Sequence, residues 1–189
     1  MKTGKEFARL AQDAKYNKYT YDQLDCQAFV EKVLADLGVR KPDGTVYNWR
    51  GSNSMYRNYF SWRGTKEECI AKFGCIPDGA FMYVWANDGG EEEHGYHDGL
   101  GNAKHVGIFC GGQLVRDSTR YKGKDGQYIR NGVGDADLKS FNRVTIPSML
   151  DFDGESGYNT DVEEMLKCIS SIRQELDRLE GFIYDIQRD

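Results

Sequence analysis

Cys26, His105 and Asp117 have the side-chain types that nucleophilic catalysis by a thiol requires. A cysteine nucleophile needs a base, and the base needs a polar group that orients it. Cys26 follows Asp25, a typical N-cap residue, at the start of a predicted helix that ends at Gly38. In the first turn of a helix, the dipole and the unpaired backbone amides favour a thiolate over a thiol. The alternative for Cys26 is a small residue of the hydrophobic core.

The sequence also predicts a β-hairpin that carries the other two residues. Its strands are expected at 105–110 and 113–119, because the two glycines between these apolar runs are typical of a two-residue turn. Such a turn pairs residue 105 with residue 118 and leaves Asp117 about one step from His105, although a slip of one residue would change its face. A carboxylate beside an imidazole fixes the ring tautomer and raises its basicity. We therefore expect His105 to be the base and Asp117 to orient it, rather than a structural histidine and an ordinary residue at a hairpin end.

Short elements are expected to hold these residues in place. A capping box, Thr3 with Glu6, predicts a helix over 4–15. The stretch 41–79 is loop-like around two short helices, and the stretch 121–135 is rich in turns and holds one strand. The further expected elements are helices at 52–60 and 65–73, a strand at 80–85, and a closing strand within 141–152.

Aromatic and acidic residues suggest how a groove around Cys26 is formed. The loop 87–104 lacks apolar periodicity, and loops of that length are usually functional. It holds three adjacent glutamates, two histidines and Asp98, which favour a lid or a solvated charge run over a metal site, so we expect no metal or other cofactor. The candidates for the wall of a substrate groove, with a core role as the alternative, are Trp49, Trp62, Trp85 and Tyr96.

The C-terminal part repeats in a different way. Apolar residues from Val162 to Ile186 recur in alternating steps of three and four, which is the a/d seam of a coiled coil. We therefore expect a domain over 1–154 and a heptad helix over 158–189 that forms a homo-oligomer through 162–186. The alternative is an amphipathic helix that packs on its own domain.

The bulk composition narrows the class of protein. The 189 residues carry a net charge of −5, so a basic nucleic-acid footprint is not expected. No apolar stretch has the length of a signal peptide or of a membrane span, and we expect synthesis in the cytoplasm without a signal peptide. Five cysteines at irregular spacing argue against a disulfide framework.

The blocks "LDCQAFVEKVL" and "HVGIFCGGQLVRDST" resemble the NlpC family of bacterial cell-wall cysteine peptidases, over roughly 5–150. The resemblance implies a papain-like α+β fold, in which the helix of the nucleophile packs on a small antiparallel sheet. It implies hydrolysis of peptide bonds in peptidoglycan stem peptides, typically next to D-γ-glutamyl. Cys26 then matches the nucleophile, His105 the base and Asp117 the third polar group. A tyrosine that assists the oxyanion would be Tyr19, with Tyr16 and Tyr21 as rivals.

The chain departs from the family pattern at Gln27-Ala28, where the family has Ser-Gly, and in the long aromatic insertion 41–79. The expected lack of a signal peptide and the style of the insertion resemble phage or prophage members, which would act at the cell wall after release or assembly. Two alternatives stay open. One is an N-acetylmuramoyl-L-alanine amidase on the same fold, and the other is a non-catalytic scaffold that works through its coiled coil.

Overall fold

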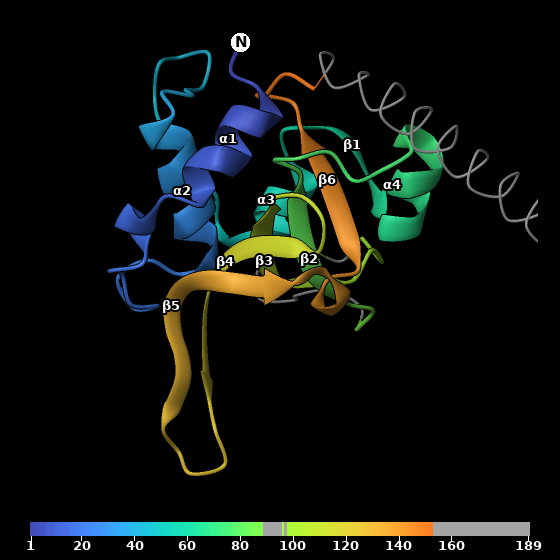
Figure 1. The fold of residues 1–189 in the computed structure, drawn as a ribbon. Helices are drawn as coiled ribbons and strands as arrows, with labels where there is room; N and C mark the ends of the chain where they lie inside the picture. The colour runs from blue at the N-terminus through green and yellow to red at the C-terminus, as the bar shows by residue number, and fades with distance from the viewer. Residues whose placement is uncertain (89–95, 97, 153–189) are drawn as a thin grey trace, which may run out of the picture. The chain divides into compact units, whose positions relative to one another are not determined.

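A six-stranded antiparallel sheet with helices packed on it forms the described part of the chain (Figure 1). The computed structural model describes residues 1–88, 96 and 98–152. The strand order is β1-β6-β2-β3-β4-β5. The strands are β1 (Phe60–Thr65), β2 (Phe81–Ala86), β3 (Asn102–Phe109), β4 (Leu114–Lys122), β5 (Tyr128–Asp137) and β6 (Arg143–Pro147). The helices are α1 (Gly4–Ala11), α2 (Cys26–Asp36), α3 (Gly51–Arg57) and α4 (Lys66–Phe73), with 3-10 turns η1 (Ala14–Tyr16) and η3 (Leu138–Ser140). The expected α+β class is therefore confirmed.

Helix α2 begins at Cys26, as the sequence predicts. The Asp25 carboxylate accepts a hydrogen bond from the N–H of Ala28 at 2.8 Å, which caps the helix. The apolar side of α2 is fully buried against β3 and β4, through Phe29, Val30, Val33 and Leu34. Burial of four such side chains contributes about 6–12 kcal/mol to the hydrophobic stabilisation, before the cost of ordering the chain. The position of Cys26 is therefore determined by both a local cap and a large apolar contact.

Helix α1 is shorter than the predicted helix over 4–15. Its capping box of Thr3 and Glu6 is present, but α1 ends at Ala11. The Asp13 side chain then accepts a hydrogen bond from the N–H of Lys15 and starts the 3-10 turn η1 instead. An aspartate that bonds to nearby backbone competes with the continuation of a helix, which explains the early end.

The stretch 41–79 contains a strand that the sequence does not reveal. The helix expected at 52–60 is α3, and the chain turns at Tyr59 into β1, which pairs with β6. Strand β1 lies at the edge of the sheet and its residues are mostly half-buried, so it lacks a clear alternation of apolar and polar residues. The helix expected at 65–73 is confirmed as α4, with the capping box of Thr65 and Glu68. The closing strand is β6, which is shorter than the stretch 141–152.

The turn between β3 and β4 differs from the predicted one. The N–H of Cys110 donates to the carbonyl of Leu114 at 2.9 Å, so the turn holds three residues rather than two. Gly107 therefore faces Asp117 across the ladder, and the predicted pairing of residues 105 and 118 is wrong by one position. Strand β3 also begins at Asn102, inside the predicted loop 87–104, so residue 105 lies within the strand. This register puts residues 105 and 117 on the same face of the sheet.

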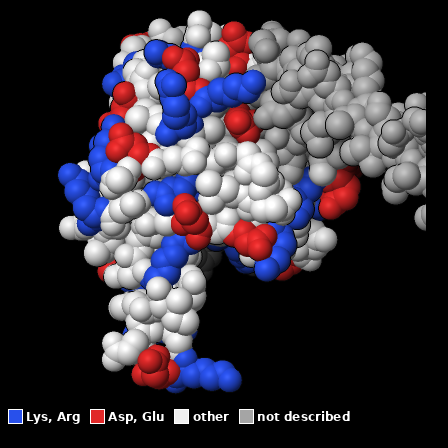
Figure 2. All heavy atoms as spheres, viewed as in Figure 1, with Lys and Arg blue, Asp and Glu red and all other residues white. Residues whose placement is uncertain are grey.

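Strands β4 and β5 extend beyond the sheet as a hairpin arm, residues 120–131, which projects from the body in Figure 1. Exposed apolar residues of the arm are Tyr121, Tyr128 and Ile129. Figure 2 shows that basic and acidic side chains are interspersed on the visible face, including the end of the arm. None of the helices in the described ranges is both long and apolar enough to cross a membrane.

Two predicted features fall outside the described residues. They are the heptad helix over 158–189, with its association through 162–186, and most of the acidic stretch of the loop 87–104. Both stay predictions.

Gly132 of β5 allows a close approach that no other residue permits. Its φ is +128°, and a Cβ there would collide with the Tyr19 carbonyl oxygen. We expect Gly132→Ala to lower the free energy of unfolding by at least about 3 kcal/mol, because it combines backbone strain with a clash. Gly126→Ala is the control, since its φ is +78° but nothing lies near its Cβ. It should cost only about 1–2 kcal/mol. Urea unfolding followed by tryptophan fluorescence measures both, and equal losses would contradict the close approach.

Candidate active site

Cys26 lies at the start of α2 and is buried, with 8% of its surface exposed. Two side chains interact with its thiol group: His105 from β3, far away in the sequence, and Tyr21 from the loop just before α2. The first-turn position supplies backbone amides without intrahelical partners, which stabilise negative charge. The structure thus brings together the predicted nucleophile and the predicted base.

His105 and Asp117 form the second predicted contact. The Nε2 atom of His105 lies 2.5 Å from Oδ2 of Asp117, and the two side chains are 16% and 3% exposed. Because Asp117 occupies Nε2, the other ring nitrogen, Nδ1, is left for Cys26. Asp117 therefore selects which nitrogen faces the sulfur.

The charge state of His105 follows from these contacts. Burial by itself would lower the pKa of His105, but hydrogen bonds with Asp117 and then Cys26, together with their charges, outweigh it. The pKa rises to about 9. The imidazole is thus protonated at neutral pH and places a positive charge beside Cys26.

Tyr21, and not Tyr19, is the tyrosine beside Cys26. Burial is the largest cause that raises the pKa of Tyr21 to about 12, followed by the charges of Cys26 and Asp25 and a hydrogen bond with Cys26. The Tyr19 side chain instead packs against the core and under the Lys18 ammonium group. Among the three candidate tyrosines, Tyr21 is therefore the one placed to donate a hydrogen bond near the sulfur.

Tyr16, the remaining rival, is fully buried, and its hydroxyl donates to Asp36 Oδ2 at 2.8 Å. Its role is to join η1 to the far end of α2.

The four aromatic residues expected to line a groove do not form one wall. Trp49 and Trp85 are 5% and 7% exposed and belong to the core beneath α2. Trp62 packs with the separate apolar cluster around α4 and contacts Phe73. Tyr96 is half-buried, and the Arg57 guanidinium lies 4.6 Å from its ring. Trp49 and Trp85 therefore take the core role that was their alternative, because burial of a large apolar area is more favourable than exposure. Trp62 is half-buried and lies in the other cluster.

Gln27, the residue after the cysteine, connects α2 with the stretch 41–79. Its Nε2 donates to the Trp49 carbonyl at 2.6 Å and to Glu31 at 2.7 Å. Glu31 also accepts the N–H of Trp49 at 2.6 Å, and burial raises the pKa of Glu31. The first turn of α2 is thereby bound to Trp49 in that stretch.

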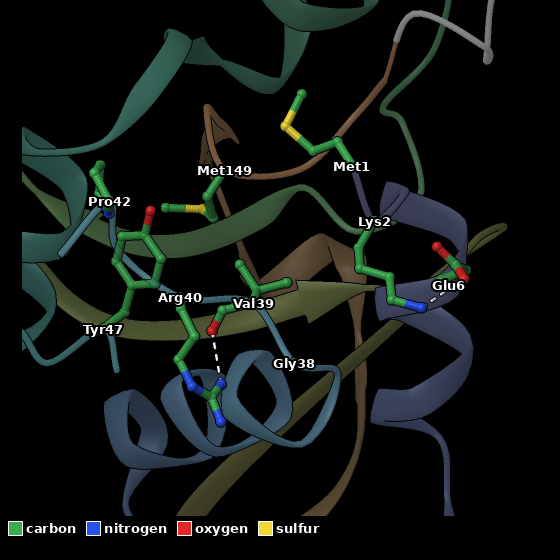
Figure 3. Close-up of a pocket in the computed structure, with 9 residues that line it drawn as sticks. All are labelled: Met1, Lys2, Glu6, Gly38, Val39, Arg40, Pro42, Tyr47 and Met149. Carbon is green, nitrogen blue, oxygen red and sulfur yellow. Dashed lines mark hydrogen bonds and ion pairs between the residues drawn. The ribbon is translucent and has the colours of Figure 1, made fainter. Parts of the chain in front are cut away.

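Two cavities differ in their relation to the site. One of about 480 Å³ lies beside the pair of His105 and Asp117 and is also lined by Arg130. The other, of about 620 Å³, lies between the start of the chain and the loop after α2, and its lining includes Lys2, Arg40 and Tyr47 (Figure 3). Cys26, His105 and Asp117 do not line the larger cavity, so we do not assign it to the candidate site.

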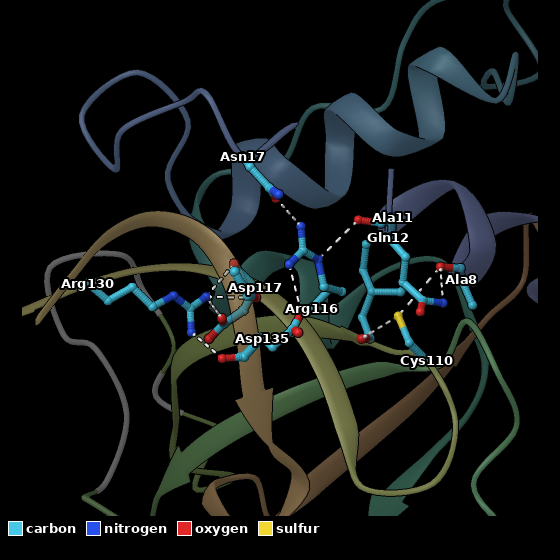
Figure 4. Close-up of polar contacts among 11 residues, drawn as sticks. Ala8, Ala11, Gln12, Asn17, Cys110, Arg116, Asp117, Arg130 and Asp135 are labelled. Carbon is cyan, nitrogen blue, oxygen red and sulfur yellow. Dashed lines mark hydrogen bonds and ion pairs between the residues drawn. The ribbon is translucent and has the colours of Figure 1, made fainter. Parts of the chain in front are cut away.

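Arg130 is a part of the site that the sequence does not single out. Its guanidinium donates to the Asp117 side chain (Figure 4). The acceptor is Oδ1, whereas His105 lies beside Oδ2. Arg130 lies in the turn-rich stretch 121–135, where no motif marks it. Only the pairing of β4 with β5 brings it to Asp117.

We expect Cys26 to react with iodoacetamide at pH 6–7 at least about ten-fold faster than the other cysteines of the folded chain. The physical reason is the protonated His105, with its pKa of about 9, because a cation beside a cysteine favours attack by the sulfur. His105→Ala should remove this advantage at pH 6 and have less effect at pH 10. Cys110, whose thiol pKa burial raises to about 12, is an internal control within the same sample, read by mass spectrometry. Equal rates in wild type and variant at pH 6 would contradict the pairing.

No family model, curated protein or solved structure matches this chain. A function therefore has to be inferred from the chemistry of the side chains around Cys26.

Proposed function

We propose that this protein is a cysteine peptidase that hydrolyses peptide bonds in peptidoglycan stem peptides, next to D-γ-glutamyl. The observation that supports this proposal most is the row of side chains from Cys26 through His105 to Asp117. A nucleophile at a helix start, a base that contacts it and a carboxylate behind the base together meet the requirements of thiol catalysis. The substrate class comes from the resemblance of the two sequence blocks to the NlpC family.

The fold supports the same proposal. In a papain-like arrangement, the helix of the nucleophile packs on an antiparallel sheet whose strands carry the base and its orienting group. Here α2 packs on β3 and β4, and these strands carry His105 and Asp117. The long β4–β5 arm and the α3–β1 segment are additions to that core.

The mechanism begins with the ion pair of Cys26 and His105. The sulfur attacks the carbonyl carbon of the scissile amide, and the C–S bond forms as the carbonyl oxygen becomes an oxyanion. The backbone N–H of Cys26 and the hydroxyl of Tyr21 stabilise that oxyanion. When the intermediate collapses, the C–N bond breaks and the amine takes the proton of His105 Nδ1, which leaves a thioester.

Hydrolysis of the thioester regenerates the enzyme. The neutral His105 takes a proton from water, and the oxygen of that water attacks the thioester carbon. The C–S bond breaks, a carboxylic acid leaves, and the thiolate pairs again with the protonated imidazole. Asp117 keeps the ring in one orientation throughout, since a rotated imidazole would lose Cys26.

The amidase alternative uses the same residues on a different amide. The two are distinguished by the product: a new free amino group within the stem peptide indicates the peptidase, and a free lactyl group on the sugar indicates the amidase. Self-association through 162–186 and action at the cell wall after phage-type release belong to the same proposal.

Cys26→Ala should abolish the release of amino groups from purified peptidoglycan, because the remaining groups cannot form the acyl-enzyme. We expect a loss of at least about 1,000-fold in turnover. Cys75→Ala is the control, since Cys75 lies outside the candidate site, and it should retain the activity of the wild type. If Cys26→Ala digests peptidoglycan normally, the peptidase proposal is wrong and the scaffold alternative gains support.

Tyr21→Phe should lower kcat by about 10- to 100-fold with little change in KM, because the lost hydroxyl acts on the oxyanion rather than on the bound substrate. Tyr19→Phe is the matched control and should leave both constants within about two-fold. The opposite ranking of the two variants would restore Tyr19 as the oxyanion tyrosine.

A further inference from the structure

Gly107, Asp117 and Gly134 lie side by side on the neighbouring strands β3, β4 and β5. Asp117 of β4 pairs with Gly107 of β3 on one side and with Gly134 of β5 on the other. A Cβ at residue 107 would lie 3.0 Å from the Asp117 Cβ and 2.6 Å from Val115 Cγ1. Glycine on both neighbouring strands therefore leaves a slot around the aspartate.

Arg130 fills the slot from the side of β5. Its side chain runs along β5 toward Gly134, where an added Cβ would lie 2.9 Å from Arg130 Nε. The Nη2 atom donates to Asp117 Oδ1, to the Asp117 carbonyl at 2.6 Å and to the Gly134 carbonyl at 2.9 Å. The Nη1 atom donates to the Asp135 carbonyl at 3.0 Å. The guanidinium is thus held by backbone groups as well as by the carboxylate (Figure 4).

The Asp117 carboxylate is divided between two cations. Oδ2 faces His105, Oδ1 faces Arg130, and only 3% of the side chain is exposed. A carboxylate with one partner could rotate about its Cβ–Cγ bond, but one with both oxygens engaged cannot without breaking a charged hydrogen bond. The positive charge of Arg130 also opposes protonation of the imidazole on the opposite side of the carboxylate.

We propose that Arg130 is a positioning residue, which holds Asp117 Oδ2 on His105 Nε2 and limits how strongly that carboxylate retains the proton of the imidazole. The role of this arrangement in turnover rests on the proposed peptidase function. The arrangement itself concerns only the side chains of this chain. A base with too strong a hold on its proton would deliver it poorly to the leaving amine and would be scarce in the neutral form that hydrolyses the thioester.

The titration of His105 reports on this arrangement without any substrate. The ionisable groups that face the ring or its partners come from each neighbouring element: Cys26 from α2, Tyr21 from the loop before it, Asp117 and Tyr121 from β4, and Arg130, Asp135 and Asp137 from β5. Of these groups, Arg130 is the cation that contacts Asp117 directly.

The experiment follows the Cε1 chemical shift of His105 against pH by NMR in the full chain, with the resonance assigned by its loss in His105→Ala. In Arg130→Met, which keeps the length of the side chain but not its charge, we expect the midpoint to rise by about one pH unit. Arg130→Lys keeps the charge and loses the shape of the guanidinium, so its midpoint should move by less than half as much.

Arg116→Met is the matched control. Arg116 is a buried arginine of β4 that donates to Asp135 Oδ1 at 2.7 Å and to Asn17 at 2.5 Å, on the helix side of the sheet (Figure 4). Its removal should destabilise the fold while it leaves the His105 midpoint unchanged. An unchanged or lowered midpoint in Arg130→Met, or an equal rise in Arg116→Met, would overturn the proposal.

Digestion of peptidoglycan by the same variants tests whether the contact of Arg130 with Asp117 affects turnover. Arg130→Met should lower kcat about ten-fold, with the optimum moved to higher pH. If Cys26→Ala shows that the protein is not a peptidase, the NMR midpoint still decides whether Arg130 controls the Asp117–His105 pair. The peptidase proposal and the proposal for Arg130 can therefore be disproved independently of each other.

Discussion

The buried carboxylate of Asp117 is the constraint on which the outer half of the sheet depends. A charge removed from water needs charged or polar hydrogen-bond partners in place of the water, and here His105 and Arg130 supply them from the two neighbouring strands. The glycines at 107 and 134 make room for this exchange. If either neighbouring strand shifted by one residue, Asp117 would face a bulky side chain or lose a cation. The ion pairs of the site therefore form only in the observed register of these strands.

Local features of the fold could be predicted from the sequence, because they depend on contacts within one turn. The starts of α1, α2 and α4 follow from side chains that cap their own backbone: Thr3, Asp25 and Thr65. The place of Cys26 in the first turn follows with them. The sequence could predict that His105 and Asp117 lie near each other on one hairpin. It could not predict that they share a face, because that depends on the length of the turn between their strands.

Features that depend on long-range contacts could not be predicted in the same way. A three-residue turn in place of a two-residue one changes the register, and the dipeptide Gly111-Gly112 is compatible with both. The loop that carries Tyr19 and Tyr21 lies against β5, more than a hundred residues away, where the Tyr19 carbonyl approaches Gly132 and the N–H of Tyr21 donates to Asn131. Arg130 contacts Asp117 only because β5 pairs with β4. Each of these requires knowledge of which strands pair, which is not present in a local pattern.

Strand β4 positions both the nucleophile and its base, because successive residues of a strand face opposite sides. Asp117 points to the face that carries His105, whereas the Ser118 hydroxyl, on the opposite face, donates to the carbonyl of Leu24 just before α2. Gln27 of the same turn holds α2 to the stretch 41–79 through the Trp49 carbonyl. The start of α2 is thus held from two directions, one of which is the strand that orients the base. A displacement of β4 would move the sulfur and the imidazole together, so their contact is preserved by the connectivity of the sheet rather than by the side chains alone.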